Sequence, residues 1–305
     1  MRIESVIWDE WYPVAIADDL QPGRTCKTQL LGHGIEYGCD SEGKLTAWHA
    51  GKPEQQCRTQ TRYLTHWVSL GDPQEPFFEV PEDAEPDRRI VGSGSMSVHV
   101  SGLRAIENFL DMAHFPFVHD GYLGAEPYTD VEPYTVTTEA NGDLYARDCR
   151  FFQPRGAASA EDGGGDMEYV YRVVRPFVAF LYKTNPVYPD RMDAIGLFVQ
   201  PVSEEHCIAH TVLFYLDNDT EDHGLRLFQQ TIFGQDLMIL SNEIPRTLPL
   251  NPGFEMPVRA DAMSMAYRRW LSDRGVNYGT YRDQGSQPLP SARSMSRPAA
   301  SQGGA

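Results

Sequence analysis

Hydrophobic and polar positions alternate along two parts of the chain and follow a helical period in three others. In the first 90 residues the alternation predicts short strands at 27–31, 34–37, 45–48 and 65–70. Further along, the same period predicts a larger antiparallel sheet, with strands at 95–100, 134–139, 144–152, 169–174, 178–182, 194–201 and 206–215. The chain therefore contains two regions that are dominated by strands.

Helical spacing separates and follows these strands. One helix is expected to begin near Ser101 or Gly102 and to be broken at Pro116, because proline lacks the backbone donor and restricts the residue before it. A long helix fits residues 222–240, and a shorter one fits 261–274. Strands, an antiparallel sheet and terminal helices together predict an α+β fold, with helices packed over one face of the larger sheet.

Three stretches of biased composition suggest the domain organisation. Residues 74–89 are rich in proline, glutamate and aspartate and are interpreted as a linker or surface crossing. We therefore predict a small β domain over residues 1–90 and a larger domain over 91–280. The tail at 281–305 is expected to be disordered, and the glycine-rich stretch at 156–166 is expected to be mobile.

Composition narrows the classes of function. Of 305 residues 41% are hydrophobic, and the formal net charge is −17, which disfavours a nucleic-acid partner because no basic stripe is present to neutralise phosphates. No apolar run is long enough to span a membrane, and no signal peptide is evident at the N-terminus. The five cysteines are scattered and odd in number, so the expected location is the reducing cytoplasm.

The densest group of chemically active residues is the segment ENFLDMAHFPFVH, residues 107–119. Asp111 and His114 are three residues apart and are expected to share one face of a helix. His119 is expected to fold back toward His114 from the turn that follows Pro116. Two imidazoles and one later carboxylate are the ligands of a mononuclear Fe(II) site that keeps positions open for oxygen.

The third ligand must come from another part of the chain, and Asp236 is the best candidate. It lies in the long helix among Ile232, Phe233 and Leu237, with few other acids on the inner face. Burial of an isolated carboxylate in such surroundings is costly unless a cation meets it. On residues alone, two histidines near a helix end are as often surface or hydrogen-bonded groups as metal ligands.

The motif resembles the iron site of the Rieske non-heme iron oxygenases, in the catalytic domain of their α-subunits. Supporting similarities are Trp11–Ala15 at the start, Leu30–Gly32, the hairpin at 40–45, the stretch 67–73 and residues 233–243. The resemblance implies that His114, His119 and Asp236 bind Fe(II) and that Asp111 bridges the iron site to an incoming Rieske cluster. It also implies a helix-grip catalytic domain preceded by a truncated Rieske-like β domain.

The sequence departs from this family where the Rieske cluster should be bound. A [2Fe–2S] Rieske cluster needs Cys-x-His and, further on, Cys-x₂-His, and neither pattern occurs upstream of the iron motif. Cys39 and Cys57 are therefore interpreted as ordinary thiols. Electrons are expected from a Rieske centre on a partner reductase. No dinucleotide fingerprint is present either, so NAD(P)H is also expected to bind only the partner.

An oxygenase component without its own cluster is similar to the bacterial methylxanthine N-demethylases. The resemblance implies O₂-dependent removal of an N-methyl group, at N7 of 7-methylxanthine, with release of formaldehyde. Two alternatives stay open: O-demethylation or hydroxylation of another aromatic compound, and a non-catalytic subunit that binds a ligand or stabilises a partner. The sequence is compatible with a homo- or hetero-oligomer and with a small aromatic or purine substrate. Four residues are candidates for the walls of a flat aromatic pocket, although plain core packing is the commoner role for any one of them: Phe117, Phe180, Phe198 and Phe233.

Overall fold

The N-terminal region forms two small sheets in a computed structural model that describes residues 3–158, 164–185, 187–188 and 190–282. Strands β2–β5 make one sheet, and β1, β7 and β6 make the other. The elements are α1 (Ser5–Trp8), β1 (Tyr12–Ile16), η1 (Ala17–Asp19), β2 (Thr25–Leu30), β3 (His33–Cys39), β4 (Leu45–His49), β5 (Lys52–Gln56), β6 (Arg58–Arg62) and β7 (Thr65–Ser69). The predicted tail lies outside the described residues from 283 onward, as do residues 159–163 of the glycine-rich stretch.

A seven-stranded antiparallel sheet forms the larger part, in the order β8-β14-β13-β12-β11-β10-β9. Its strands are β8 (Arg89–Val98), β9 (Thr135–Thr138), β10 (Leu144–Gln153), β11 (Gly165–Arg175), β12 (Val178–Thr184), β13 (Met192–Ser203) and β14 (His206–Tyr215). The helices are η2 (Pro81–Ala84), α2 (Gly102–Leu110), α3 (Phe115–Val118), α4 (Asp222–Leu240), η3 (Arg259–Asp261) and α5 (Ala262–Asp273). The prediction of an α+β fold with an antiparallel sheet is confirmed.

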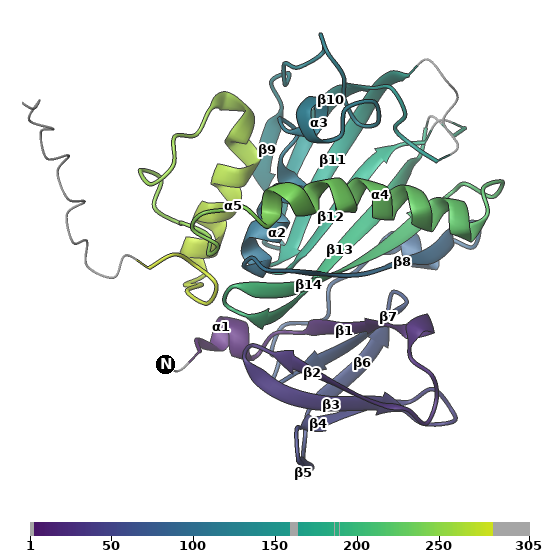
Figure 1. Cartoon of the computed structure of the whole chain (residues 1–305), viewed down its shortest axis with the longest axis vertical. Helices are drawn as coiled ribbons and strands as arrows, with labels where there is room; N and C mark the ends of the chain where they lie inside the picture. Colours follow the sequence, from purple (N-terminus) through teal and green to yellow (C-terminus); the bar gives the residue numbers. More distant parts are fainter. Residues whose placement is uncertain (1–2, 159–163, 186, 189, 283–305) are drawn as a thin grey trace, which may run out of the picture.

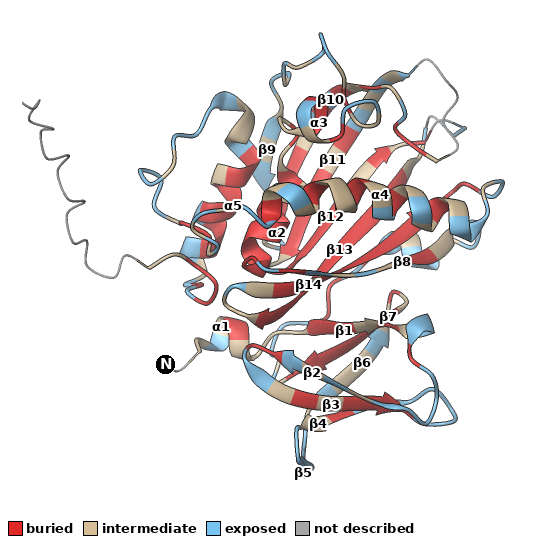
Figure 2. Cartoon of the chain, in the orientation of Figure 1, coloured by how far each residue is buried: buried red, intermediate tan, exposed pale blue. Residues whose placement is uncertain are grey.

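The long helix α4 crosses one face of the large sheet, and the small N-terminal sheets lie below the large sheet in the view of Figure 1. The burial pattern shows the strands beneath α4 as almost continuously buried (Figure 2). Because successive strand residues point to opposite faces, Leu181 and Leu197 face the α4 side while Phe180 and Phe198 face the N-terminal region. The sheet thus has a core on each face, and the aromatic side chains of the second core lie on the face away from α4.

The segment 74–89 is more than the surface linker expected from its composition. Phe77 and Phe78 are buried, stack on each other and pack edge-on against Trp67. Their neighbours in this second core include Phe180, Phe198 and Phe214 of the large sheet. The segment therefore fastens the N-terminal region to the large sheet, which a count of its prolines and acids did not reveal.

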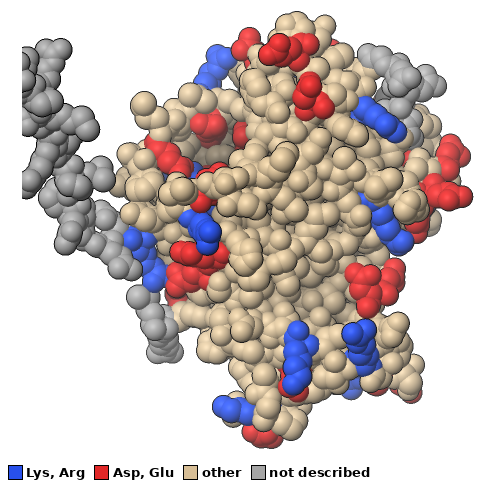
Figure 3. All heavy atoms as spheres, viewed as in Figure 1, with Lys and Arg blue, Asp and Glu red and all other residues tan. Residues whose placement is uncertain are grey.

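Two surface properties bear on partners. Over the described residues, no helix has the length and apolar character needed to cross a membrane. On the face seen in Figure 3, basic side chains are scattered singly among acidic ones, and the area over α4 is largely uncharged. This face thus carries no basic stripe of the kind that tracks a phosphate backbone.

Candidate metal centre

Asp111 and His114 lie at a break between the helices α2 and α3, and the prediction that they share one helix is wrong. Helix α2 is capped at its start by Ser101, whose side-chain oxygen accepts from the Leu103 N–H, and it ends at Leu110. Asp111 has extended backbone angles, and its carboxylate accepts a hydrogen bond from the Ala113 N–H at 2.8 Å. The carboxylate thus stabilises the turn that takes the chain from α2 to His114.

Pro116 lies inside a short helix, α3, where a break was expected. It lies in the first turn of α3, where a missing N–H costs nothing because that group has no helical partner anyway. His114 and His119 flank this single turn, so the turn fixes the spacing between them. Gly124 packs against it, and a Cβ there would approach the Pro116 nitrogen to 2.6 Å, which explains the need for glycine.

Asp236 lies on the buried face of α4, as the sequence predicted. It follows Gln229, Ile232 and Phe233 on this face at spacings of seven, four and three residues, and all four side chains are buried. The helix therefore delivers one carboxylate into the space above the sheet. Leu225 and Leu240 extend the same face and pack into the core.

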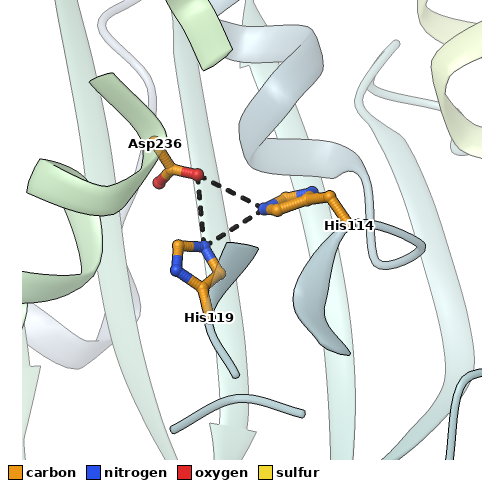
Figure 4. Close-up of side chains that lie close together, drawn as sticks. All are labelled: His114, His119 and Asp236. Atoms are coloured by element: carbon orange, nitrogen blue, oxygen red, sulfur yellow. Dashed lines mark hydrogen bonds and ion pairs between the residues drawn. The ribbon is translucent and has the colours of Figure 1, made fainter. Parts of the chain in front are cut away.

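The three candidate ligands meet at a single point (Figure 4). His114 Nε2 and His119 Nε2 are 3.2 Å apart, and Asp236 Oδ1 lies 3.3 Å from the first and 3.2 Å from the second. Among the residues that the structure describes, these are the only His, Cys, Asp or Glu side chains that form a potential metal-binding group of three or more. The structure thus brings together the three residues that the sequence singled out.

Hydrogen bonds on the far sides of both imidazoles determine which nitrogen faces the centre. His114 Nδ1 donates to Asp111 Oδ2 at 3.1 Å, and His119 Nδ1 donates to Gln235 Oε1 at 2.8 Å. A carboxylate and an amide oxygen can only accept, so in each neutral ring the Nε2 lone pair is free and points inward. This is the arrangement in which metal-binding histidines are usually oriented.

The centre favours positive charge. Burial opposes protonation of His114, but hydrogen bonds with Asp111 and Asp236 outweigh it and raise the pKa of His114 to about 9. Burial alone would raise the pKa of Asp236, yet the close approach of both imidazoles to its Oδ1 lowers that pKa to about 2. Oδ1 of Asp236 is buried without a well-directed hydrogen bond among the described residues. Two imidazole nitrogens and a carboxylate oxygen suit a divalent metal with positions left open, and iron fits this donor set.

A cavity that is partly open to solvent begins at the three ligands, and its empty space, open solvent included, is about 610 Å³. Its walls come from α4 above and from β11, β12 and β13 below, with Tyr169, Leu181, Ile195, Phe228 and Phe233 among the lining residues. Of the four phenylalanines predicted to line it, only Phe233 does so. Phe180 and Phe198 lie on the opposite face of the sheet, and Phe117 is exposed on α3.

Two residues that the sequence analysis missed belong to this site. Gln235 orients His119, and it was overlooked because nothing but its position next to Asp236 distinguishes it from other helix glutamines. Lys183, from β12, is a buried cation in the cavity wall, and a lysine within a strand ordinarily indicates an exposed edge. Its burial follows from the register of the sheet rather than from local sequence.

Cysteine and histidine pairs elsewhere do not form a cluster site in the described residues. Cys39 Sγ lies 3.4 Å from His66 Nε2, but this is an isolated pair. Cys207 and His210 have the Cys-x₂-His spacing, but they are three residues apart on β14 and point to opposite faces. Strands β4, β5 and β6 occupy the segment between the predicted 40–45 hairpin and Trp67, where β5 pairs with β4 and β6 pairs with β7.

Residues 98–274, more than half of the chain, match the family described as vanillate O-demethylase oxygenase, C-terminal domain. The chain therefore belongs to this family of Rieske-type oxygenase components, and it is an enzyme. Oxygenases of this class use mononuclear non-heme iron.

Among individual proteins, the chain is similar to NdmC of Pseudomonas sp. (strain TJI-51), a probable methylxanthine N7-demethylase. The two are 51% identical over 279 residues, which cover 91% of this chain and 98% of that one. The methylxanthine N3-demethylase NdmB of Pseudomonas putida is 22% identical over 222 residues, 72% of this chain and 60% of that one.

Solved structures support the fold. NdmA of Pseudomonas putida CBB5 with caffeine superposes with a TM-score of 0.71 at 17% identity, covering 88% of this chain and 91% of that one. Dicamba monooxygenase bound to dicamba gives a TM-score of 0.70 at 14% identity, covering 88% and 97%. The architecture is thus shared by oxygenases that bind different small aromatic ligands.

Proposed function

We propose that this chain is the terminal oxygenase of a methylxanthine N-demethylase and removes the N7 methyl group of 7-methylxanthine. The observation that carries the proposal is the convergence of His114, His119 and Asp236 at the end of a largely apolar cavity. The 51% identity with a probable N7-demethylase supports the choice of substrate. A flat bicyclic ring matches the aromatic and aliphatic side chains on both walls.

In this proposal His114, His119 and Asp236 hold Fe(II), which, when bound, supplies the reductive activation of O₂. The cavity walls exclude water and hold the methyl carbon toward the ligands. Overall, the methyl C–H bond is replaced by C–OH at the expense of O₂, two electrons and two protons, and one water forms. The N–CH₂OH product then collapses to formaldehyde and the free N–H, with no further oxidant.

The first test supplies a Rieske-containing reductase, NADH and the iron-loaded protein with a panel of substrates. Formaldehyde is expected from 7-methylxanthine and at most one tenth as fast from 1- or 3-methylxanthine, because only one methyl position reaches the ligands. Chromatography of the xanthine products and a formaldehyde assay measure this. Faster release from a methoxybenzoate would favour the second candidate, an aromatic O-demethylase, which the name of the matched family suggests. A folded wild type that binds no iron would instead indicate a non-catalytic subunit.

We further propose that electrons enter beside Asp111 from a Rieske centre on a partner protein. Asp111 hydrogen-bonds His114 on one side and lines an open surface depression on the other, together with Glu243, Glu255 and Met256. Met256 lines this depression and is exposed, and three further exposed apolar residues lie next to its lining residues in the sequence. These four are here called the donor patch: Ile244, Phe254, Met256 and Val258. An apolar patch next to a depression that both Asp111 and His114 line suits a partner protein that must dock close to the metal ligands.

Met256→Asp is expected to weaken this docking, because the Met256 side chain is 95% exposed and a charge there would be desolvated on contact. The apparent KM for the reductase should rise about tenfold, while iron content and xanthine affinity stay unchanged. Leu227→Asp is the matched control, since Leu227 is an exposed apolar residue on α4 outside the donor patch. Equal effects of the two substitutions on reductase-dependent turnover would contradict the assignment of this surface.

A further inference from the structure

Lys183 is a buried cation in the wall of the substrate cavity. Only 3% of the Lys183 surface is exposed, and the residue lines the cavity together with Tyr169, Phe228 and Asp236. Burial lowers the pKa of its ammonium group to about 8. Burying an ammonium group costs free energy unless acceptors or an opposite charge surround it, so its partners in the protein are informative.

The described residues satisfy Lys183 only in part. Nζ donates to the Gly156 carbonyl oxygen and lies 5.5 Å from the Tyr215 ring and 5.8 Å from the Phe228 ring. Asp193 faces it across β12 and β13, but its two oxygens accept from the Asn185 side chain and the Leu216 N–H. No carboxylate of the described residues comes within ion-pair distance of Lys183. An ammonium group has three donors, so it can still serve a ligand in the cavity.

The position of Lys183 suits the far edge of a purine. Phe228 precedes Asp236 by eight residues on α4, about 12 Å along the helix axis at 1.5 Å per residue. Because Lys183 Nζ lies near the Phe228 ring, Lys183 and the three metal ligands lie near opposite ends of the cavity. Tyr171 also belongs to the lining, where it is fully buried and packs against Phe109 of α2, and its hydroxyl finds no hydrogen-bond partner among the described residues. The cavity thus offers a cation to the polar edge of a substrate whose methyl group faces the three metal ligands.

Resting on the proposed function, we propose that Lys183 determines substrate specificity by pairing with the pyrimidine edge of a xanthine ionised at a ring nitrogen. A xanthine methylated only at N7 keeps two imide-like N–H groups, and loss of one proton to solvent spreads negative charge onto the ring carbonyl oxygens. A cation in a low-dielectric cavity favours that ionised form. Caffeine carries methyl groups on both pyrimidine nitrogens, cannot ionise and leaves Lys183 without its counter-charge.

Calorimetric titration of the iron-loaded chain, anaerobic and without a reductase, tests this because binding is then measured without turnover. Wild type is expected to bind 7-methylxanthine more tightly than caffeine and to release a proton only with the first, seen as a buffer-dependent heat. Lys183→Met should weaken the binding of 7-methylxanthine roughly tenfold to a hundredfold, as expected for loss of a charge-assisted hydrogen bond. The affinity for caffeine should stay within about twofold of wild type. Lys183→Gln, which can still donate to Gly156 but is neutral, should behave like Lys183→Met.

The alternative is that Lys183 only tethers Gly156 and its loop. In that case Lys183→Met would weaken the binding of both xanthines equally, or Lys183→Gln would bind 7-methylxanthine with wild-type affinity. Either result overturns the specificity role. Unchanged affinity of both variants for 7-methylxanthine would also overturn it. Failure of the wild type to bind any methylxanthine would instead overturn the proposed function, and this inference with it.

Discussion

Replacement of His114 by alanine is expected to give a folded protein that retains no iron and releases no formaldehyde. Its Nε2 is one of three inward-facing donor atoms within 3.3 Å of one another, and the remaining His119 and Asp236 cannot hold a labile divalent ion alone. Loss of a residue that merely orients a ligand costs about tenfold to a hundredfold in metal affinity, so loss of a ligand should exceed this. Iron content after anaerobic purification and turnover with the reductase measure both effects.

His223→Ala is the matched control, because His223 is an exposed histidine in the first turn of α4, far along the helix from Asp236. It should keep wild-type iron content and activity. Circular dichroism and the unfolding midpoint of both variants separate loss of metal from loss of fold. If His114→Ala kept stoichiometric iron, the assignment of the three ligands would be wrong.

The elements and ligands that the sequence predicted correctly are those specified by local pattern. Helix α4 runs over the predicted residues 222–240, and β14 runs over 206–215, because each has a strong period and clear breakers at its ends. Asp236 was identified by a simple energetic argument, that a carboxylate on an apolar helix face needs a cation. The structure places it beside both histidines, although 117 residues separate it from His119 in the sequence.

What the sequence did not reveal depends on the packing of distant elements. Strand period specifies that Phe180 and Leu181 face opposite ways, but not which face meets α4, so the aromatic lining was assigned to the wrong side. The end of α2 at Leu110 was missed because Asp111 and Met112 continue the helical pattern. There, the side chain of Asp111 bonds to the backbone and competes with the helix. Local spacing therefore identified the metal ligands but not the backbone conformation that orients them.

This conformation matters most at Asp111, and Asp111→Asn is expected to separate ligand orientation from electron delivery. The asparagine oxygen can still accept from His114 Nδ1, so the ring orientation and iron content should be largely retained. The negative charge, which helps to hold the pKa of His114 at about 9, is lost, and with it the charged link between the surface depression and the ligand. Reductase-dependent formaldehyde release should fall roughly tenfold to a hundredfold, the range for residues that support a metal ligand.

Glu243→Gln is the matched control for this substitution. It removes one carboxylate from the same depression, where Glu243 lies 3.8 Å from Arg104, but it does not touch either histidine. Turnover of this variant should stay within about threefold of wild type, as expected for a partly exposed ion pair. Affinity for 7-methylxanthine, measured without the reductase, should be unchanged in both variants. If Asp111→Asn and Glu243→Gln slowed turnover equally, the effect would come from the charge of the docking surface, and Asp111 would have no special place on the electron path.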